Sequence, residues 1–130
     1  ITMFENPWIK YFSGNMIYTT TIQFNPEEMG NGNVYLDLGE VADMAKVWIN
    51  EKYIGGVWTS PYSLDITRAL RKGENRIRID VVNTWVNRLI GNTIYPEMAE
   101  ETWVGMSPYD KNSPLRKSGL IGPVILKVTH

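Results

Sequence analysis

The stretch AKVWINEKYIGGVW, residues 45–58, decides the fold class. Ala45, Val47 and Ile49 recur at every second position, a period that sends successive side chains to opposite faces of a β-strand. Asn50 and Glu51 then fall where a tight hairpin turn fits, although glutamate is a poor residue for the positive φ of such turns. The stretch therefore predicts two antiparallel strands with one buried face, and it leaves Trp48 on the other face.

Four further runs show the same alternation of apolar and polar side chains. They occupy residues 16–24, 34–38, 77–81 and 124–128, and Asn25-Pro26 together with Gly30-Asn31-Gly32 separates the first run from the second. Five half-buried strands of this kind indicate a largely antiparallel domain of two sheets. We therefore expect an all-β protein, an antiparallel β-sandwich.

Two segments depart from the strand pattern. Asp65 can cap a short helix over residues 66–72, with Gly73 placed to end it. Residues 91–117 contain three prolines and no clean periodicity, yet they also carry Tyr95, Trp103 and Tyr109. A long loop of this kind inside a compact domain is usually functional or packs against another element.

Length, charge and composition exclude several classes of protein. A chain of 130 residues is about the size of one domain. With 13 basic and 14 acidic residues, it has no net positive charge that would attract nucleic acid or anionic lipid. Cysteine is absent, and the single histidine is the terminal His130, which excludes disulfides, cysteine nucleophiles and multi-histidine metal sites. The chain begins at Ile1 and has no apolar run longer than residues 120–126. We therefore expect no signal peptide or membrane span, and a piece of a longer protein.

Three motifs in order carry a family resemblance. Residues 45–58 are followed by PYSLDIT at 61–67 and by GENRI at 73–77. This succession resembles the sugar-binding jelly-roll domain of glycoside hydrolase family 2, within the galactose-binding-domain-like group. Glu51 departs from the pattern, because it stands where the family has a hairpin glycine.

Two more motifs narrow the resemblance. NTWVNRLIGN at 83–92 and SGLIGPV at 118–124 are similar to segments of the C-terminal domain in large α-L-rhamnosidase-like glycoside hydrolases. Asn92 replaces the aspartate usual there, which weakens any ionic or metal role at that position. The resemblance implies that residues 1–130 form one jelly-roll domain, a C-terminal fragment of a larger, secreted or periplasmic bacterial enzyme.

Aromatic rings and planar polar groups are the side chains that sugar recognition uses. Pyranose rings stack their C–H faces on tryptophan and tyrosine, while their hydroxyls bind amides and guanidinium forks. The alternative is that such aromatics close the ends of the sandwich core, and that Arg88 pins the long loop to the sandwich. The candidate carbohydrate-binding residues are Trp58, Tyr62, Trp85, Asn87, Arg88 and Trp103.

Catalysis within this chain is the disfavoured hypothesis. Glycoside hydrolysis needs two carboxyl groups flanking the bond, and Glu97, Glu100, Glu101 and Asp110 all lie in the long loop. Acids in such a loop are usually solvated, so we assign no catalytic residue.

We also expect no cofactor. A calcium site built from Asp37, Glu40 and Asp43 has oxygen ligands near one another in the sequence, but it lacks a known loop spacing. A basic cluster is read as a solvated face rather than an anion site, since acids lie among its members. Its members are Arg68, Arg71, Lys72, Arg76 and Arg78.

The sequence favours a non-catalytic carbohydrate-binding or accessory domain of a polysaccharide-degrading glycoside hydrolase. Its expected partners are an oligo- or polysaccharide and the catalytic domain of the parent enzyme, with no nucleic acid and no membrane. The alternative is a purely structural domain that docks on the catalytic domain through loop 91–117. We expect a monomer, because the short edge strands give no reason for self-association.

Overall fold

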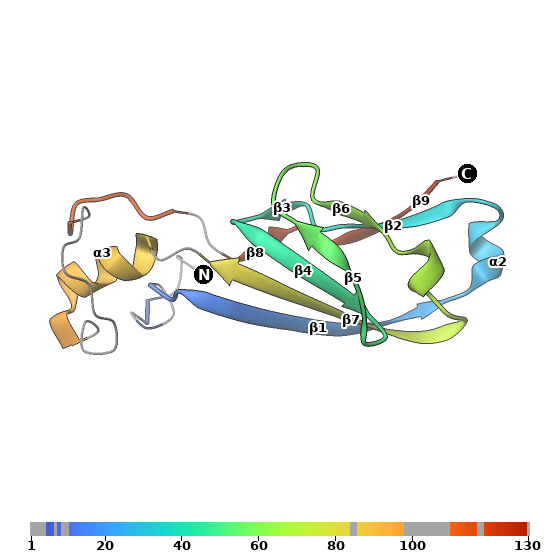
Figure 1. The fold of residues 1–130 in the computed structure, drawn as a ribbon, viewed down its shortest axis with the longest axis horizontal. Helices are drawn as coiled ribbons and strands as arrows, with labels where there is room; N and C mark the ends of the chain where they lie inside the picture. Colours follow the sequence, from blue (N-terminus) through green and yellow to red (C-terminus); the bar gives the residue numbers. More distant parts are fainter. Residues whose placement is uncertain are drawn as a thin grey trace.

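The computed structural model describes residues 5–6, 8, 11–83, 86–97, 110–116 and 119–129 (Figure 1). These residues fold into an elongated molecule of antiparallel sheets with the helix α3 at one end and the short helix α2 at the other. The strands are β1 (Gly14–Phe24), β2 (Asn33–Asp37), β3 (Glu40–Val41), β4 (Met44–Ile49), β5 (Lys52–Val57), β6 (Ser63–Asp65), β7 (Gly73–Asn83), β8 (Leu120–Gly122) and β9 (Ile125–Thr129).

Two main sheets enclose the core. The first has the order β1-β7-β4-β5 and the second β6-β2-β9, while β3 and β8 form a small third pair. The strand pairings within the sheets are all antiparallel, so the predicted all-β sandwich is confirmed. The fully buried core draws on alternate positions of the central strands, as the period of two requires. Its side chains include Val34, Leu36, Ala45, Val47, Ile49, Ile77, Ile79 and Val81.

The hairpin between β4 and β5 carries two residues in the left-handed region. Asn50 has φ 50° and Glu51 has φ 69°, the combination that a two-residue turn needs to match the twist of its strands. Asn50 tolerates this conformation and also bonds across the sheet, because its Oδ1 accepts from the Arg76 amide at 2.9 Å. The predicted tight turn is confirmed, with glutamate at a position that favours glycine.

Asn75 ties this turn to the start of β7. It is fully buried, and its Oδ1 accepts from the side-chain Nδ2 of Asn50 at 2.8 Å and from the Arg71 backbone at 2.9 Å. Its Nδ2 donates to the carbonyl oxygens of Arg71 at 2.7 Å and Gly73 at 3.1 Å. One side chain therefore makes four hydrogen bonds inside the molecule and joins the β4–β5 turn to residues 71–75.

The short helix predicted over residues 66–72 is a single 3₁₀ turn, η1 (Thr67–Ala69). Its N-cap is Ile66 rather than the predicted Asp65, although the Asp65 carboxylate accepts a hydrogen bond from the Thr67 backbone at 2.9 Å just before the turn. The sequence predicted one helix, but the structure also has α2 (Pro26–Met29). This helix begins after Asn25, whose side chain accepts a hydrogen bond from the Glu27 backbone. Proline is favoured at the first helical position, so the break at Asn25-Pro26 also starts a helix.

Helix α3 (Val86–Ile94) enters the segment that was predicted to lack structure, so that prediction is wrong for residues 91–94. Val86 and Ile90 are four residues apart and pack with Tyr11, a helical spacing that a glycine obscures. Gly91 is required because a Cβ there would lie 2.5 Å from the Tyr11 ring. Within the described ranges, no helix has the length and apolar character to span a bilayer.

The last strand is present but its apolar side chains are not buried. Residues 124–128 were predicted as a half-buried run, yet Leu126 is 40% exposed and Val128 is 43% exposed. Their partners across the strand pair, Leu36 and Val34, are each 1% exposed. The core-facing side of the second sheet is therefore covered along β2 and uncovered along β9.

Replacing Asn75 by alanine should lower the free energy of unfolding by about 2–3 kcal/mol, because the change leaves buried backbone groups without partners. Asn33, an exposed residue on β2, provides the matched control. Urea denaturation of the variants Asn75→Ala and Asn33→Ala measures the difference. Equal midpoints for the two variants would contradict the role assigned to Asn75.

Acid should destabilise the domain through two carboxylates. Hydrogen bonds from the Lys127 ammonium and the Gly39 amide lower the pKa of Asp37, and bonds from Thr67 lower the pKa of Asp65, both from an ordinary 3.8. A carboxyl whose pKa is lowered by folding stabilises the fold above its unfolded pKa, and loses that effect as the pH falls through the folded value. Unfolding free energy should therefore be steady above about pH 5 and fall below about pH 4. Urea titrations of the Asp37→Asn variant should show a shallower fall of the unfolding free energy at acidic pH. A fall as steep as that of the parent would contradict this cause.

Candidate functional site

Three aromatic side chains lie along the outer face of β4 and β5. Trp48 and Tyr53 are cross-strand partners, with ring centroids 5.3 Å apart and planes tilted by 56°. A Cβ at Gly56 would stand 3.6 Å from the Tyr53 hydroxyl and 3.9 Å from Cζ3 of Trp58. Trp58 therefore continues the row beyond Gly56, and we call Trp48, Tyr53 and Trp58 the aromatic strip.

A β-bulge brings Tyr53 into this row. Val47 pairs with Gly55, so regular pairing would set Trp48 opposite Ile54, but the register shifts and Trp48 pairs with Tyr53. A bulge of this kind re-aims one side chain without ending the strand. As a result Tyr53 is 54% exposed on the outer face, whereas ordinary alternation after the buried Val57 leaves Trp58 67% exposed.

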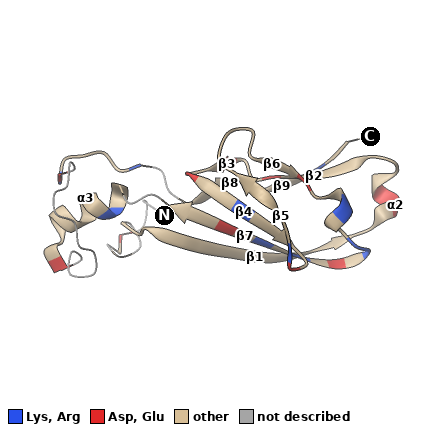
Figure 2. Ribbon diagram, in the orientation of Figure 1, with Lys and Arg blue, Asp and Glu red and all other residues tan. Residues whose placement is uncertain are grey.

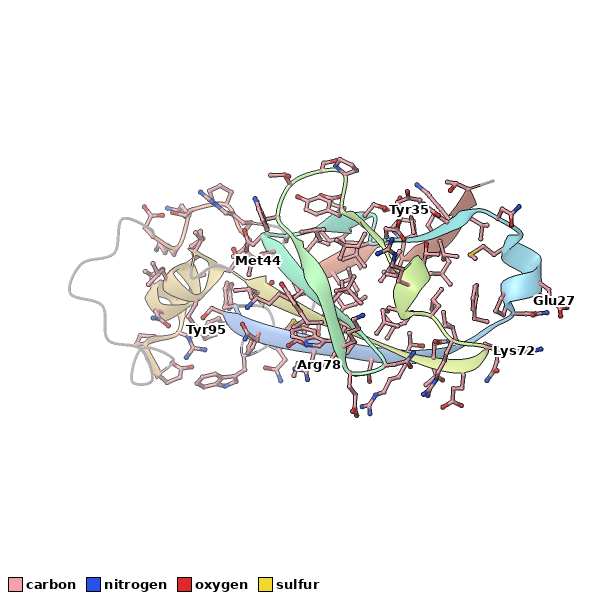
Figure 3. All side chains as sticks on the ribbon, turned by 45° about the vertical axis from the view of Figure 1, so that its right-hand side comes forward. Glu27, Tyr35, Met44, Lys72, Arg78 and Tyr95 are labelled. Atoms are coloured by element: carbon pink, nitrogen blue, oxygen red, sulfur yellow. The ribbon has the colours of Figure 1, made fainter. Side chains whose placement is uncertain are left out.

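Arginine side chains border the strip on β7. Arg78 is the partner of Trp48 in the β4–β7 pair, and its guanidinium carbon lies 4.9 Å from the Trp48 ring centroid. Its Nε and Nη2 each donate to a different oxygen of Asp80 at 2.7 Å, a bidentate pair that raises the pKa of Arg78. This pair fixes the guanidinium of Arg78, which is labelled in Figure 3, against the Trp48 indole.

Arg76 and Glu51 complete the surface. They line a shallow hollow of about 330 Å³ together with Trp48 and Arg78. Among the described residues, none forms a hydrogen bond or ion pair with the Arg76 guanidinium. Figure 2 shows residues of both charge signs on β7. The hollow thus offers a free guanidinium fork and a carboxylate next to an aromatic wall.

The chemistry available on this face is binding. Indole and phenol rings stack on the C–H faces of sugars, and a guanidinium fork takes vicinal hydroxyls or a carboxylate in a bidentate manner. Glu51 can accept hydrogen bonds from hydroxyl groups. The other carboxylate of the face, Asp80, is engaged by Arg78.

The structure separates the candidate residues that the sequence indicated. Trp58 belongs to the aromatic strip. Tyr62 is half-buried and packs against the core, and its carbonyl oxygen accepts from the Leu38 amide at 2.8 Å. Trp85 and Trp103 lie outside the described residues.

Asn87 and Arg88 are buried on α3, at the end of the molecule away from α2. The Asn87 amide donates to the Arg116 carbonyl oxygen at 2.6 Å and accepts from the Arg116 amide at 2.7 Å. The Arg88 guanidinium lies 5.2 Å from the Trp8 ring centroid. Asn87 therefore ties α3 to residue 116, whereas pinning of the loop by Arg88 and sugar binding by these two residues both stay predictions.

Sequence reasoning placed Trp48 outside the core but missed most of the face around it. The alternation of Arg76 and Arg78 with buried isoleucines already put both arginines on the outer side of a strand. What the sequence did not supply was the register that sets Arg78 opposite Trp48. The reading of these arginines as a solvated face was therefore incomplete, because one stacks on an indole and both line the hollow.

The other predicted groups do not converge in the described part of the chain. No group of three or more acidic, histidine or cysteine side chains suited to a metal ion occurs there, and Asp37 is bonded to Lys127 and Gly39. Of the loop acids, Glu97 and Asp110 are exposed, whereas Glu100 and Glu101 lie outside the described residues.

A family model described as "Glycosyl hydrolase 2 galactose-binding domain-like" matches residues 4–119. The chain belongs to this family. The galactose-binding-like domain also superposes on a rhamnosidase from Novosphingobium with a TM-score of 0.86 and 43% identity, over 95% of this chain and 12% of that one. A protein of Formosa agariphila named as a β-glucuronidase is 35% identical over 148 aligned positions, covering 95% of this chain and 13% of the relative.

More remote structures share the fold alone. A β-D-glucuronidase from Dictyoglomus thermophilum has 21% identity and a TM-score of 0.55 over 63% of this chain. The galactose-binding-like domain spans 12–14% of the length of these three relatives. Their names therefore describe polypeptides of which this domain corresponds to a small part.

Replacing Gly91 by alanine should destabilise the packing of α3 by about 1–3 kcal/mol, because the new methyl group meets the rigid Tyr11 ring. The exposed Thr93 on the same helix provides the control variant, Thr93→Ala. Urea unfolding followed by circular dichroism measures both. A Gly91→Ala variant as stable as the control would contradict the close approach of Tyr11 and α3.

Proposed function

We propose that this galactose-binding-like domain is a non-catalytic accessory domain of a glycoside hydrolase, and that it holds saccharide on the aromatic strip. The observation that carries the proposal is the row of Trp48, Tyr53 and Trp58 beside the open guanidinium of Arg76. Large rings exposed next to fixed polar groups suit a ligand with one apolar and one hydroxylated side. Membership in the family supports the enzyme context.

The ligand class follows from the charge of the hollow. Asp80 neutralises Arg78, so among the described residues the hollow keeps one guanidinium, Arg76, and one carboxylate, Glu51, outside any ion pair. A carboxylated sugar residue would satisfy the Arg76 fork, and the β-glucuronidase name of one relative supports testing uronides alongside neutral rhamnosides. The reaction itself belongs, in this proposal, to the remainder of a longer polypeptide, acting on extracellular or periplasmic polysaccharide.

A second candidate function is docking on a catalytic domain. Ile94, the last residue of α3, lies in the predicted docking segment 91–117 and is 38% exposed, which favours it because exposed apolar side chains mark interaction surfaces. This role and saccharide binding use different parts of the domain, so the two can coexist.

Titration calorimetry with neutral rhamnose-containing and uronate-containing oligosaccharides tests the saccharide proposal. We expect binding that Trp58→Ala weakens by about 2- to 12-fold, the range that loss of one stacked ring gives. Ile121 is 44% exposed on β8, outside the first sheet, so Ile121→Ala should bind as the parent does. Absence of heat for every saccharide, with circular dichroism showing a folded β protein, would refute independent binding.

A further inference from the structure

The two main sheets have unequal numbers of strands. The first has four strands and the second three. The sheets meet at β5 and β6, since a Cβ at Gly55 on β5 would contact Leu64 of β6 at 3.4 Å. If the strands of the two sheets are matched in order from this shared edge, β2 faces β4 and β9 faces β7. The outermost strand of the first sheet, β1, is left with no strand opposite it.

The burial of the side chains agrees with this arrangement of facing strands. On the inner side of β7, Ile77, Ile79 and Val81 are at most 4% exposed. On the inner side of β1 every side chain is only half-buried or exposed, although Tyr18 and Ile22 belong to the apolar alternation. In the second sheet the exposed fraction rises from 1% at Leu36 to 40% at its partner Leu126. The apolar side chains on the inner sides of β1 and β9 are thus less covered than those of β7 and β2, although Tyr18 and Ile22 touch the core, and we call the space between β1 and the outer edge of β9 the slot.

The edge of β9 also presents backbone hydrogen-bonding groups. β9 pairs with β2 on one side, and in the described residues no strand pairs with its other side. Edge strands in natural proteins are usually protected by charge, proline or a covering element. The apolar Leu126 and Val128 give no such protection along the inner side of β9. The slot therefore has both the shape and the bonding groups for one more strand.

We propose that a single extended segment of the same polypeptide, from outside residues 1–130, adds to the edge of β9 and fills this slot. Its backbone bonds to β9, and its alternate apolar side chains cover Leu126 and Val128 on one sheet and face Tyr18 and Ile22 on the other. The second sheet then has four strands, equal to the first. The proposal is independent of saccharide binding, because the slot and the aromatic strip lie on different faces.

A second copy of this chain does not fit the slot. Pairing the β9 edges of two copies would extend the second sheet, but β1 projects one strand beyond β9 in each copy. The β1 of one copy would then occupy the space of its partner's β7. The slot is one strand wide, and it excludes any occupant that brings a whole sheet with it.

The size of the relatives supports the choice of the same polypeptide. Two relatives match 95% of this chain, and the match covers 12% and 13% of their own lengths. Each relative is therefore about eight times as long as this chain. A segment that belongs to the same chain also docks at high effective concentration, so it does not need high intrinsic affinity.

Thiol protection in the complete polypeptide that contains residues 1–130 tests the proposal. The sequence has no cysteine, so Val128→Cys and Ile17→Cys each place one new thiol at comparably exposed positions, one in the slot and one on the outer side of β1. Mass spectrometry then follows alkylation of each site by N-ethylmaleimide. We expect the thiol at position 128 to react at least about tenfold more slowly than that at position 17, a difference set by burial. Leu126→Cys repeats the measurement if the first variant is unstable.

Hydrogen exchange identifies the occupant. An added strand should slow exchange at successive amides along β9, whereas a flat domain face would protect the thiol and leave alternate amides fast. Equal alkylation at positions 128 and 17, alternate fast amides, or protection that depends on protein concentration would each overturn the proposal. A complete polypeptide that supplies no further segment would overturn it as well.

Discussion

Burial of alternate side chains on β4 and β7 is the constraint on which the rest of this structure depends. Val47, Ile49, Ile77 and Ile79 are almost completely inaccessible and hold the first sheet against the second. Because the period of a strand is two, burying these positions forces the residues between them onto the outer face. Trp48 and Arg78 are on the surface for that reason, and the β4–β7 register sets them side by side.

The turn that joins β4 to β5 couples this core to the proposed binding face. Asn50 and Asn75 lock the turn through buried amide hydrogen bonds, and the turn holds Glu51 at a positive φ beside the hollow. Residues in such backbone conformations persist only when their surroundings determine them, and they often occur at functional sites. The glutamate that departs from the family's glycine is thus one of the groups that gives this hollow its polarity.

The strands were predictable from sequence because each alternates apolar and polar residues over its length. The residues from 45 to 58 specified two strands and a tight turn, and the structure has both. Helix α3 was missed because Gly91 interrupts its pattern, and the reason for that glycine is a contact with Tyr11 eighty residues earlier. Tyr53 was missed because a bulge sets its register, and the exposure of β9 because it depends on which strands face it. Local pattern therefore predicted the elements, while contacts between distant segments determined the candidate site.

The central claim is that the outer face of β4, β5 and β7 contacts saccharide. Nuclear magnetic resonance of the folded chain tests it most directly, by following indole N–H signals as a uronate-containing oligosaccharide is added. The account predicts that the signals of Trp48 and Trp58 shift with saccharide concentration while that of Trp8, beside Arg88, stays in place. Shifts confined to Trp8 and to the amides of α3, with Trp48 and Trp58 unmoved, would contradict it.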